Sequence, residues 1–324
     1  MNNLTISGSP HVHGELSVKK IMCMVILALM PAFIVSVYFF GFNAIRVTLI
    51  SVATCVLTEF LIQKYLMKGE CTISDGSAVL TGILLAFNVP SNIPWWMVVV
   101  GGIVAIGIAK MSFGGLGKNP FNPALVGRVF MLISFPVAMT TWPTPSQPFF
   151  RMGVDVITGP TTLGLLKEGG AVAVSNINYW DMLIGNTGGS FGEMCALALI
   201  IGGIFLIIMK IIDWQTPVII IATVTLVSGI CWLIDPTTYV NPLYHILSGG
   251  LMLGAFFMAT DMVTSPMTTG GKCIFALGIG LITVIIRLWG QYPEGMSFAI
   301  LIMNAVVPLI NKGFKPKRFG VVKK

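Results

Sequence analysis

Charged residues are scarce in this sequence. Of its 324 residues, 10% are Asp, Glu, Lys or Arg and 55% are hydrophobic, whereas a soluble domain carries about 25% charged residues. The scarcity excludes an ordinary soluble domain and predicts an integral membrane protein that crosses the bilayer many times. The net charge of +7 does not indicate nucleic-acid binding. Most Lys and Arg residues lie at the ends of apolar segments, where membrane orientation and anionic lipid explain them.

Motifs for redox centres and nucleotides are also missing. The six cysteines include no Cys-x-x-Cys pair, and five lie in or beside apolar runs, so we expect small buried side chains, not disulfides or a metal cluster. No Gly-rich nucleotide motif follows a strand, and no catalytic triad is visible. His11 and His13 lack a third ligand and are interpreted as part of a solvated tail. The sequence therefore predicts no metal site and no catalytic residue.

Ten apolar segments are present, in two groups of five. They are residues 21–40, 45–62, 77–89, 95–109, 123–139, 194–212, 217–234, 246–259, 272–289 and 296–310. Several approach the ~20 residues that a spanning helix needs, and the third and eighth are clearly short. Because backbone groups cannot stay unpaired in lipid, we expect an all-α membrane protein with about ten transmembrane helices. Its units would be residues 21–139 and 194–311, joined by a connection at 140–193 and flanked by tails at 1–20 and 312–324.

Basic residues predict the orientation of these segments. If the ten segments alternate across the membrane, nearly all Lys and Arg residues of the connections fall on one side, and Arg46, Arg151 and Lys167 fall on the other. The positive-inside rule then places both tails in the cytoplasm and residues 140–193 outside. The seven tryptophans lie near segment ends, as an aromatic belt at the membrane surface requires.

The two groups of five resemble each other. The first contains Gly82-Ile-Leu-Leu-Ala-Phe, then Pro94 and an apolar run that ends at Lys110; the second contains Gly254-Ala-Phe-Phe-Met-Ala, then Pro266 and a run that ends at Arg287. Because five is an odd number, the second copy would be inverted relative to the first. The short third and eighth segments break at equivalent places, which predicts a central functional path. The alternative is that Gly and Pro only permit close helix packing.

Four charged residues are candidates for a function inside the bilayer. They are Glu59, Arg128, Asp261 and Arg287. A charge in the bilayer costs ~2.5–3.5 kcal/mol, so each indicates a use. Asp261 would accept hydrogen bonds from amides of a broken helix or face a cofactor, and Arg128 would reach an anionic group. The alternative for each is a snorkelling side chain or a structural ion pair, and Glu59 and Arg287 are the best candidates for snorkelling.

The connection at 140–193 contains Asp155-Val-Ile-Thr158-Gly159-Pro160-Thr161. Thr, Gly and Pro are turn residues, and the residue types alone favour a plain turn. A Thr hydroxyl is a poor nucleophile at neutral pH unless another group activates it. Within the motif, Asp155 is the one available base.

Five stretches of the sequence resemble the NqrB/RnfD family of membrane subunits. They are Ser9-Pro-His-Val-His13, Asp75-Gly-Ser-Ala-Val-Leu-Thr-Gly82, Gly114-Gly-Leu-Gly-Lys-Asn-Pro-Phe-Asn-Pro-Ala124, Gly185-Asn-Thr-Gly-Gly-Ser-Phe-Gly-Glu193 and Ala259-Thr-Asp-Met-Val-Thr-Ser-Pro266. The resemblance covers nearly the whole chain. The short N-terminal tail is more like the RnfD branch, from ferredoxin–NAD oxidoreductase complexes. Arg128 after Asn-Pro-Ala-Leu is more like the NqrB branch, from sodium-pumping NADH–quinone oxidoreductases.

The resemblance implies a covalent flavin. In this family a flavin transferase joins FMN through a phosphoester to the last Thr of Asp-x-x-(Ser/Thr)-Gly-Ala-Thr, which makes Thr161 the acceptor, with Asp155, Thr158 and Gly159 in its motif. Pro160 replaces the usual Ala, and Thr162 is the fallback acceptor. The transferase supplies the activation, so the loop need only be exposed and flexible. Arg128 and Asp261 are further candidates for cofactor contacts, and a noncovalent riboflavin is a second candidate cofactor.

The resemblance also implies a role and partners. The chain would pass electrons between ferredoxin and NAD through other subunits of an Rnf complex (RnfA, RnfB, RnfC, RnfE and RnfG) in a bacterial inner membrane, coupled to Na⁺ or H⁺ translocation. It would not be catalytic alone. The alternatives are an NqrB-like subunit, a flavin-free channel or carrier, and a structural scaffold subunit.

Overall fold

The described part of the chain is almost entirely helical. A computed structural model describes residues 17–68, 71–145, 158–174 and 177–315. Six helices are long and apolar enough to cross a membrane: α1 (Val18–Phe40), α2 with its extension (Phe42–Met67), α4 with its extension (Trp95–Phe113), α10 (Gln215–Ile234), α13 (Thr269–Trp289) and α14 (Met296–Gly313). The predicted class, a helical membrane protein with several spans, is confirmed.

Shorter helices occupy the remaining apolar segments. They are α3 (Ser77–Phe87), α5 (Pro123–Ser134), α6 (Pro136–Thr140), α9 (Ala196–Ile208) and α12 (Leu251–Leu253), which continues into the π-helical turn η5 (Gly254–Met258). Each of the ten predicted segments therefore contains helix. The third and eighth segments are again among the short ones, because α3 stops before Asn88-Val-Pro and η5 stops before a run of turns.

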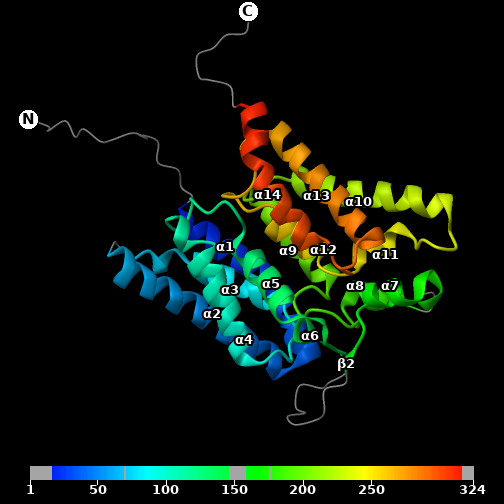
Figure 1. The fold of residues 1–324 in the computed structure, drawn as a ribbon, viewed down its shortest axis with the longest axis horizontal. Helices are drawn as coiled ribbons and strands as arrows, with labels where there is room; N and C mark the ends of the chain where they lie inside the picture. The colour runs from blue at the N-terminus through cyan, green and yellow to red at the C-terminus, as the bar shows by residue number, and fades with distance from the viewer. Residues whose placement is uncertain (1–16, 69–70, 146–157, 175–176, 316–324) are drawn as a thin grey trace, which may run out of the picture.

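The two groups of helices lie on opposite sides of the molecule. Figure 1 shows α1 to α6, in blue to green-cyan, on one side, and α10 to α14, in yellow to red, on the other. Helix α1 packs against α9 and α5 packs against α14, so both contacts cross the boundary between the groups. Within each group the helix of the second segment packs against the helix of the fourth, α2 on α4 and α10 on α13.

The ends of the two short segments meet in the core. Asn88, at the end of α3, donates a hydrogen bond from Nδ2 to the Leu84 carbonyl at 2.6 Å, and the same nitrogen lies 3.7 Å from Met258 Sδ. Met258 ends η5, and its carbonyl accepts from Asn122 Nδ2 at 3.2 Å. Broken helix ends are thus sheltered inside the protein, as lipid requires.

The connection at 140–193 is more ordered than the sequence predicts. Its described part contains β1 (Trp142–Pro143) paired antiparallel with β2 (Thr158–Gly159), then α7 (Thr162–Ala173) and α8 (Tyr179–Ile184). The buried side chains of Leu163, Met182 and Phe191 hold it against the helices. The small β-pair is an exception to the all-α prediction, and the prediction of a flexible loop is wrong for these residues.

The cysteines agree only partly with the prediction. All six are free, and Cys55 and Cys195 are buried. Cys23 and Cys71 are exposed, so the prediction of buried side chains is wrong for them. Cys23 lies on a surface of α1 that faces away from the other helices, where an apolar side chain suits lipid as well as a protein core.

Candidate functional site

Thr161 caps a helix. It directly precedes α7, and its Oγ accepts a hydrogen bond from the Gly164 backbone amide at 3.0 Å. Its side chain is only 9% exposed. The neighbouring Thr162 is also buried, and its carbonyl accepts from the Tyr244 hydroxyl at 2.6 Å. The expectation of an exposed acceptor is therefore wrong for this conformation, because the cap and the apolar contacts of Leu163 draw the segment inward.

The other motif residues take different positions. Gly159 and Thr158 form β2 and pair with Trp142 and Pro143. Asp155 lies outside the described residues. The strand pair thus fixes the chain three residues before Thr161 and α7 fixes it directly after.

Two pockets meet at Thr161. We call the first the Glu193 pocket; its polar lining includes Thr161, Ser190, Glu193, Ser248 and Glu294. The second, the Trp142 pocket, is mostly apolar and aromatic, and Met139, Trp142, Tyr292, Arg128, Glu294 and Thr161 line it. Thr161 therefore lies between a polar pocket and an apolar one.

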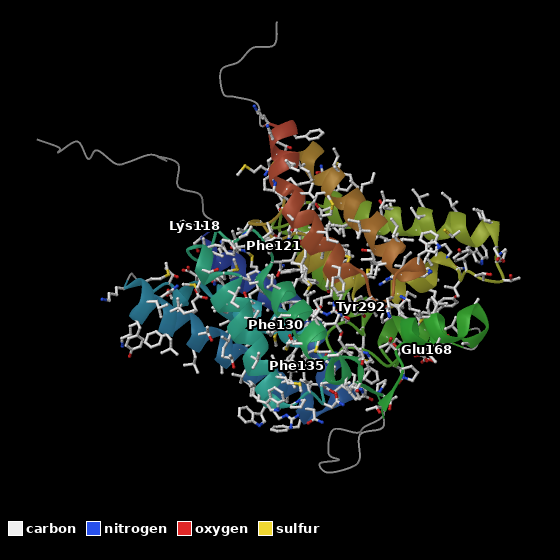
Figure 2. All side chains as sticks on the ribbon, in the orientation of Figure 1. Lys118, Phe121, Phe130, Phe135, Glu168 and Tyr292 are labelled. Carbon is white, nitrogen blue, oxygen red and sulfur yellow. The ribbon has the colours of Figure 1, made fainter. Side chains whose placement is uncertain are left out.

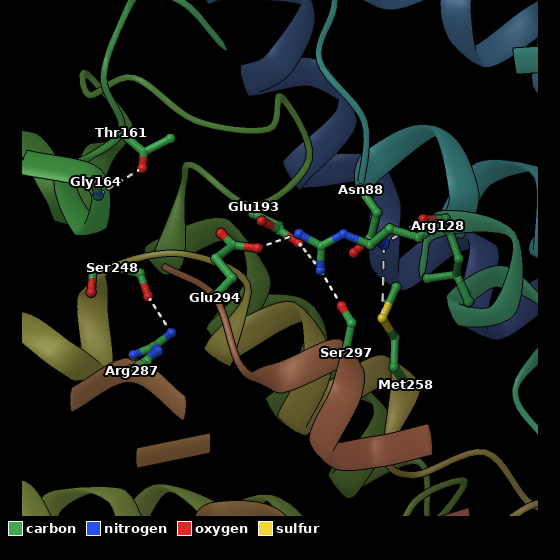
Figure 3. A network of polar contacts seen from close by, with 11 residues as sticks. Asn88, Arg128, Thr161, Gly164, Glu193, Ser248, Met258, Arg287, Glu294 and Ser297 are labelled. Atoms are coloured by element: carbon green, nitrogen blue, oxygen red, sulfur yellow. Dashed lines mark hydrogen bonds and ion pairs between the residues drawn. The ribbon is translucent and has the colours of Figure 1, made fainter. Parts of the chain in front are cut away.

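A buried charge network adjoins these pockets. Arg128 of α5 donates to the Glu294 carboxylate and to the Ser297 hydroxyl, and its Nη1 lies 3.8 Å from Glu193 Oε1. Figure 3 shows both glutamates directed toward Arg128 from two different loops. Arg128 does reach an anionic group, as predicted, and that group is a carboxylate of the protein itself.

A second arginine, Arg287, contacts the loop that precedes α12. Arg287 of α13 donates to the carbonyls of His245 at 2.5 Å and Ser248 at 3.0 Å. Gly249 lies between the networks with φ of 61°, and an added Cβ would sit 2.9 Å from Glu294 Oε1 and 3.3 Å from Arg287 Nη2. Only glycine suits this backbone conformation and this space.

The two carboxyl groups differ in their titration. Burial raises the pKa of Glu193 to about 8, and the nearby Glu294 charge adds to this while Arg128 opposes it. Burial would also raise the pKa of Glu294, but its ion pair and hydrogen bond with Arg128 hold that pKa below its usual value. Of the two carboxyl groups, Glu193 therefore holds a proton more readily, and Glu294 is the ion-pair partner of Arg128.

Glu59 and Arg287 do not snorkel. Lys110 Nζ lies 2.6 Å from Glu59 Oε2 and 2.8 Å from Ser77 Oγ, and Glu59 is 1% exposed. Arg287 is also buried. The snorkelling prediction for Glu59 and Arg287 is wrong, because the side chains point into helix contacts that position along the segment does not reveal. For Glu59 and Arg128 the alternative of a structural ion pair is confirmed.

Asp261 belongs to a different cavity. Its carboxylate accepts from the Val263 amide at 3.4 Å and from Thr264 Oγ1 at 3.1 Å, as an acceptor at the end of a broken helix should. It lines a cavity of about 110 Å³ together with Lys110, Asn119, Asn122, Phe256 and Phe257. The structure therefore brings Arg128 and Thr161 together and leaves Asp261 apart from them.

Sequence reasoning missed Glu193 and Glu294. Both lie outside the apolar segments, so neither stands out as a charge in the membrane. Glu193 closes one of the stretches that carry the family resemblance, and Glu294 follows Pro293 in the short connection between α13 and α14. Glu294 and Arg128 are 166 positions apart in the sequence, and no local sequence pattern predicts such a contact.

Comparison with known proteins gives consistent matches. The model of a family described as the NQR2, RnfD, RnfE family matches residues 5–320. The chain is 47% identical to the D subunit of the proton-translocating ferredoxin:NAD(+) oxidoreductase complex of Clostridium ljungdahlii, over 98% of this chain and 97% of the relative. It is 46% identical to the D subunit of the Na(+)-translocating ferredoxin:NAD(+) oxidoreductase complex of Acetobacterium woodii, over 99% and 96%. It is 37% identical to the D subunit of an ion-translocating oxidoreductase complex of Escherichia coli, over 97% and 98%.

Proposed function

Because the chain belongs to the NQR2, RnfD, RnfE family, we propose that it is the D subunit of an ion-translocating ferredoxin:NAD⁺ oxidoreductase and carries FMN on Thr161. The relatives are named as subunits of such redox-driven complexes. The chain therefore works with partner subunits and does not catalyse the overall reaction alone. RnfA, RnfB, RnfC, RnfE and RnfG are the partners expected from the resemblance, together with a flavin transferase for maturation.

The observation that carries the flavin proposal is the place of the Thr161 hydroxyl. It stands at the N-terminus of α7, where backbone amides and the positive end of the helix dipole favour a phosphate group. The Trp142 pocket offers aromatic and apolar surface to a ring system. These residues fit a phosphate-linked flavin.

The chain's own residues supply position and insulation. FMN, when attached, exchanges electrons one at a time. The α7 amides would hold the phosphate, and the buried side chains of Trp142 and Met139 would shield the ring from water. The Arg128–Glu294 pair sets the local charge that such a ring would experience. Because Thr161 is buried in this conformation, we infer that the segment before α7 opens for the transferase, or receives its flavin before it packs.

A noncovalent riboflavin is the second cofactor in the proposal. The cavity beside Asp261 measures about 110 Å³ and is lined mostly by apolar side chains, as small-molecule sites are. Phe256 and Phe257 offer aromatic contacts, and Asn119 has a side-chain oxygen without a hydrogen-bond partner in the described structure. Asp261 would then contact this second flavin and not the one on Thr161.

The proposal includes the membrane arrangement. The chain would lie in the bacterial inner membrane as two inverted five-helix repeats, with both termini in the cytoplasm and Thr161 on the outer side. In support, the described start of α1 and the end of α14 lie toward one end of the molecule, and β2 lies toward the other (Figure 1). Lys110 and Arg287 also occupy similar places, since each lies at the end of the fourth segment of its group and binds an oxygen near the start of the third.

Flavin fluorescence of the denatured protein in a gel tests the attachment. We expect a fluorescent band from the chain produced with its flavin transferase, and a nonfluorescent band from Thr161→Ala, because alanine has no oxygen to esterify. Thr162→Ala is the matched control, one residue away and equally buried, and should stay fluorescent.

The other outcomes separate the alternatives. Fluorescence lost only in Thr162→Ala would move the attachment by one residue. A dark wild type, with a transferase active on another acceptor, would mean that Pro160 prevents flavinylation. The flavin-free carrier or scaffold would then replace this proposal. An NqrB-like subunit would give the same gel but would pair with a quinone-reducing complex.

A further inference from the structure

The Glu193 pocket is lined by buried oxygens that lack partners. Ser190 Oγ, Ser248 Oγ and both carboxylate oxygens of Glu193 have no hydrogen-bond partner in the described part of the chain. Ser190 and Ser248 are each 2% exposed and Glu193 is 5% exposed. Native proteins rarely bury polar groups unsatisfied, and an exception commonly marks an ordered water or ion. The four oxygens come from two loops, one before α9 and one before α12, so the fold gathers them at one point.

The pocket has the size for one small particle. The space among these oxygens admits about one water-sized sphere. Glycines keep the loops close: a Cβ on Gly250 would lie 2.5 Å from Glu193 Oε1. The lining therefore suits a single bound water or bare ion better than an organic ligand.

The charged groups around the pocket decide whether its ligand is a cation or an anion. Arg128 is committed to Glu294 and Ser297, and its nearest approach to Glu193 is 3.8 Å. Arg287 is committed to the carbonyls of His245 and Ser248. These two cations and the Glu294 carboxylate are the charged groups that act on Glu193 from the packed elements. Glu193 is thus a buried carboxyl without a hydrogen-bonded counter-charge, which requires either a proton or another cation.

We propose that Glu193, Ser190 and Ser248 form a binding site for one monovalent cation, held on the Glu193 carboxylate beside Thr161. The cation is a proton or Na⁺, and the two exchange one for one, since a sodium ion that enters displaces the proton from the carboxyl group. Carboxylate and hydroxyl oxygens are ligands for hard cations. One carboxylate beside Arg128 carries too little negative charge for a divalent ion. A role in coupling this exchange to electron transfer rests on the proposed function, because the site borders the proposed flavin anchor.

Infrared difference spectroscopy of the purified, membrane-reconstituted complex tests the site. In choline buffer we expect a protonated-carboxyl band that disappears as the pH rises through about 8, and Glu193→Gln should abolish it. The sign follows from the raised pKa, because the folded protein keeps a proton that an exposed glutamate would already have released. If Na⁺ binds, adding it at fixed pH below 8 removes the band. A band that Na⁺ leaves unchanged would overturn the proposed exchange.

Matched variants make the test specific. Glu168→Gln is the control, because Glu168 is an exposed glutamate on α7 near the edge of the molecule (Figure 2), and it should leave the band unchanged. Ser190→Ala removes one oxygen and keeps the carboxyl, so it should leave the band in place and raise the Na⁺ concentration needed to remove it about tenfold. A band that persists in Glu193→Gln, or a wild type with no titrating carboxyl between pH 6 and 10, would overturn the proposal. None of these readings requires flavin, so their failure is distinct from a failure of Thr161 flavinylation.

Discussion

Replacing Lys110 with Met is expected to lower the free energy of unfolding by about 3–5 kcal/mol, because the change leaves a buried carboxylate without its counter-charge. Lys110 Nζ lies 2.6 Å from Glu59 Oε2 and 2.8 Å from Ser77 Oγ. Both ionic side chains are almost fully buried, at 2% and 1% exposure. The measurement is unfolding by SDS in mixed detergent micelles, followed by tryptophan fluorescence.

A double variant shows whether the charge is the cause. Glu59→Gln combined with Lys110→Met removes both charges and keeps the hydrogen-bonding shape of residue 59, which accepts from Gln63 Nε2 at 3.2 Å. We expect the double variant to recover most of the lost stability, since replacing both members of a buried pair costs far less than removing one. Lys118→Met, at an exposed position, should change the unfolding free energy by less than about 0.5 kcal/mol. A double variant no more stable than Lys110→Met would show that packing around the lysine stem, not charge, explains the loss.

The sequence predicts the helices well because lipid leaves the chain little choice. An apolar run in a membrane must pair its own backbone groups, so the length and boundaries of each run indicate a helix directly. All ten runs contain helix, and the short α3 ends next to Asn88-Val-Pro, a turn sequence that no helix continues through. The connection at 140–193 obeys no such rule. Its polar composition predicts a loop, whereas Leu163, Met182 and Phe191 fold it against the helices.

The site is less predictable because its contacts are long-range. The Thr161 prediction comes from the family resemblance, and the neighbouring Thr162 carbonyl is contacted by Tyr244, 82 positions away in the sequence. The position of Glu59 near a segment end favours snorkelling, but its partner Lys110 is 51 positions away. Local sequence reports which residues are charged. The tertiary fold alone decides which of them meet.

A larger side chain at Gly202 should strongly destabilise the contact between the two groups of helices. An added Cβ at Gly202 would lie 2.1 Å from the carbonyl oxygen of Ala28 on α1, far closer than van der Waals contact. A backbone carbonyl within a helix cannot rotate away, so α1 and α9 would have to separate. We expect Gly202→Ala to lower the unfolding free energy by about 3 kcal/mol, the upper end of the usual cost of overpacking. The same SDS titration measures it.

Gly107→Ala is the control for this prediction. Gly107 also lies in an apolar helical segment, but its Cβ would meet Ile62 Cδ1 at an ordinary 3.6 Å. Alanine there should be neutral or stabilise by up to about 1 kcal/mol, because it is the better helix former. A large difference between the two variants would establish that close approach of α1 and α9 holds the halves together, as small residues do at membrane helix interfaces. If both variants unfold at the same SDS concentration as the wild type, the contact between α1 and α9 is not tightly packed. Contacts such as Arg128–Glu294 must then hold the two groups of helices together.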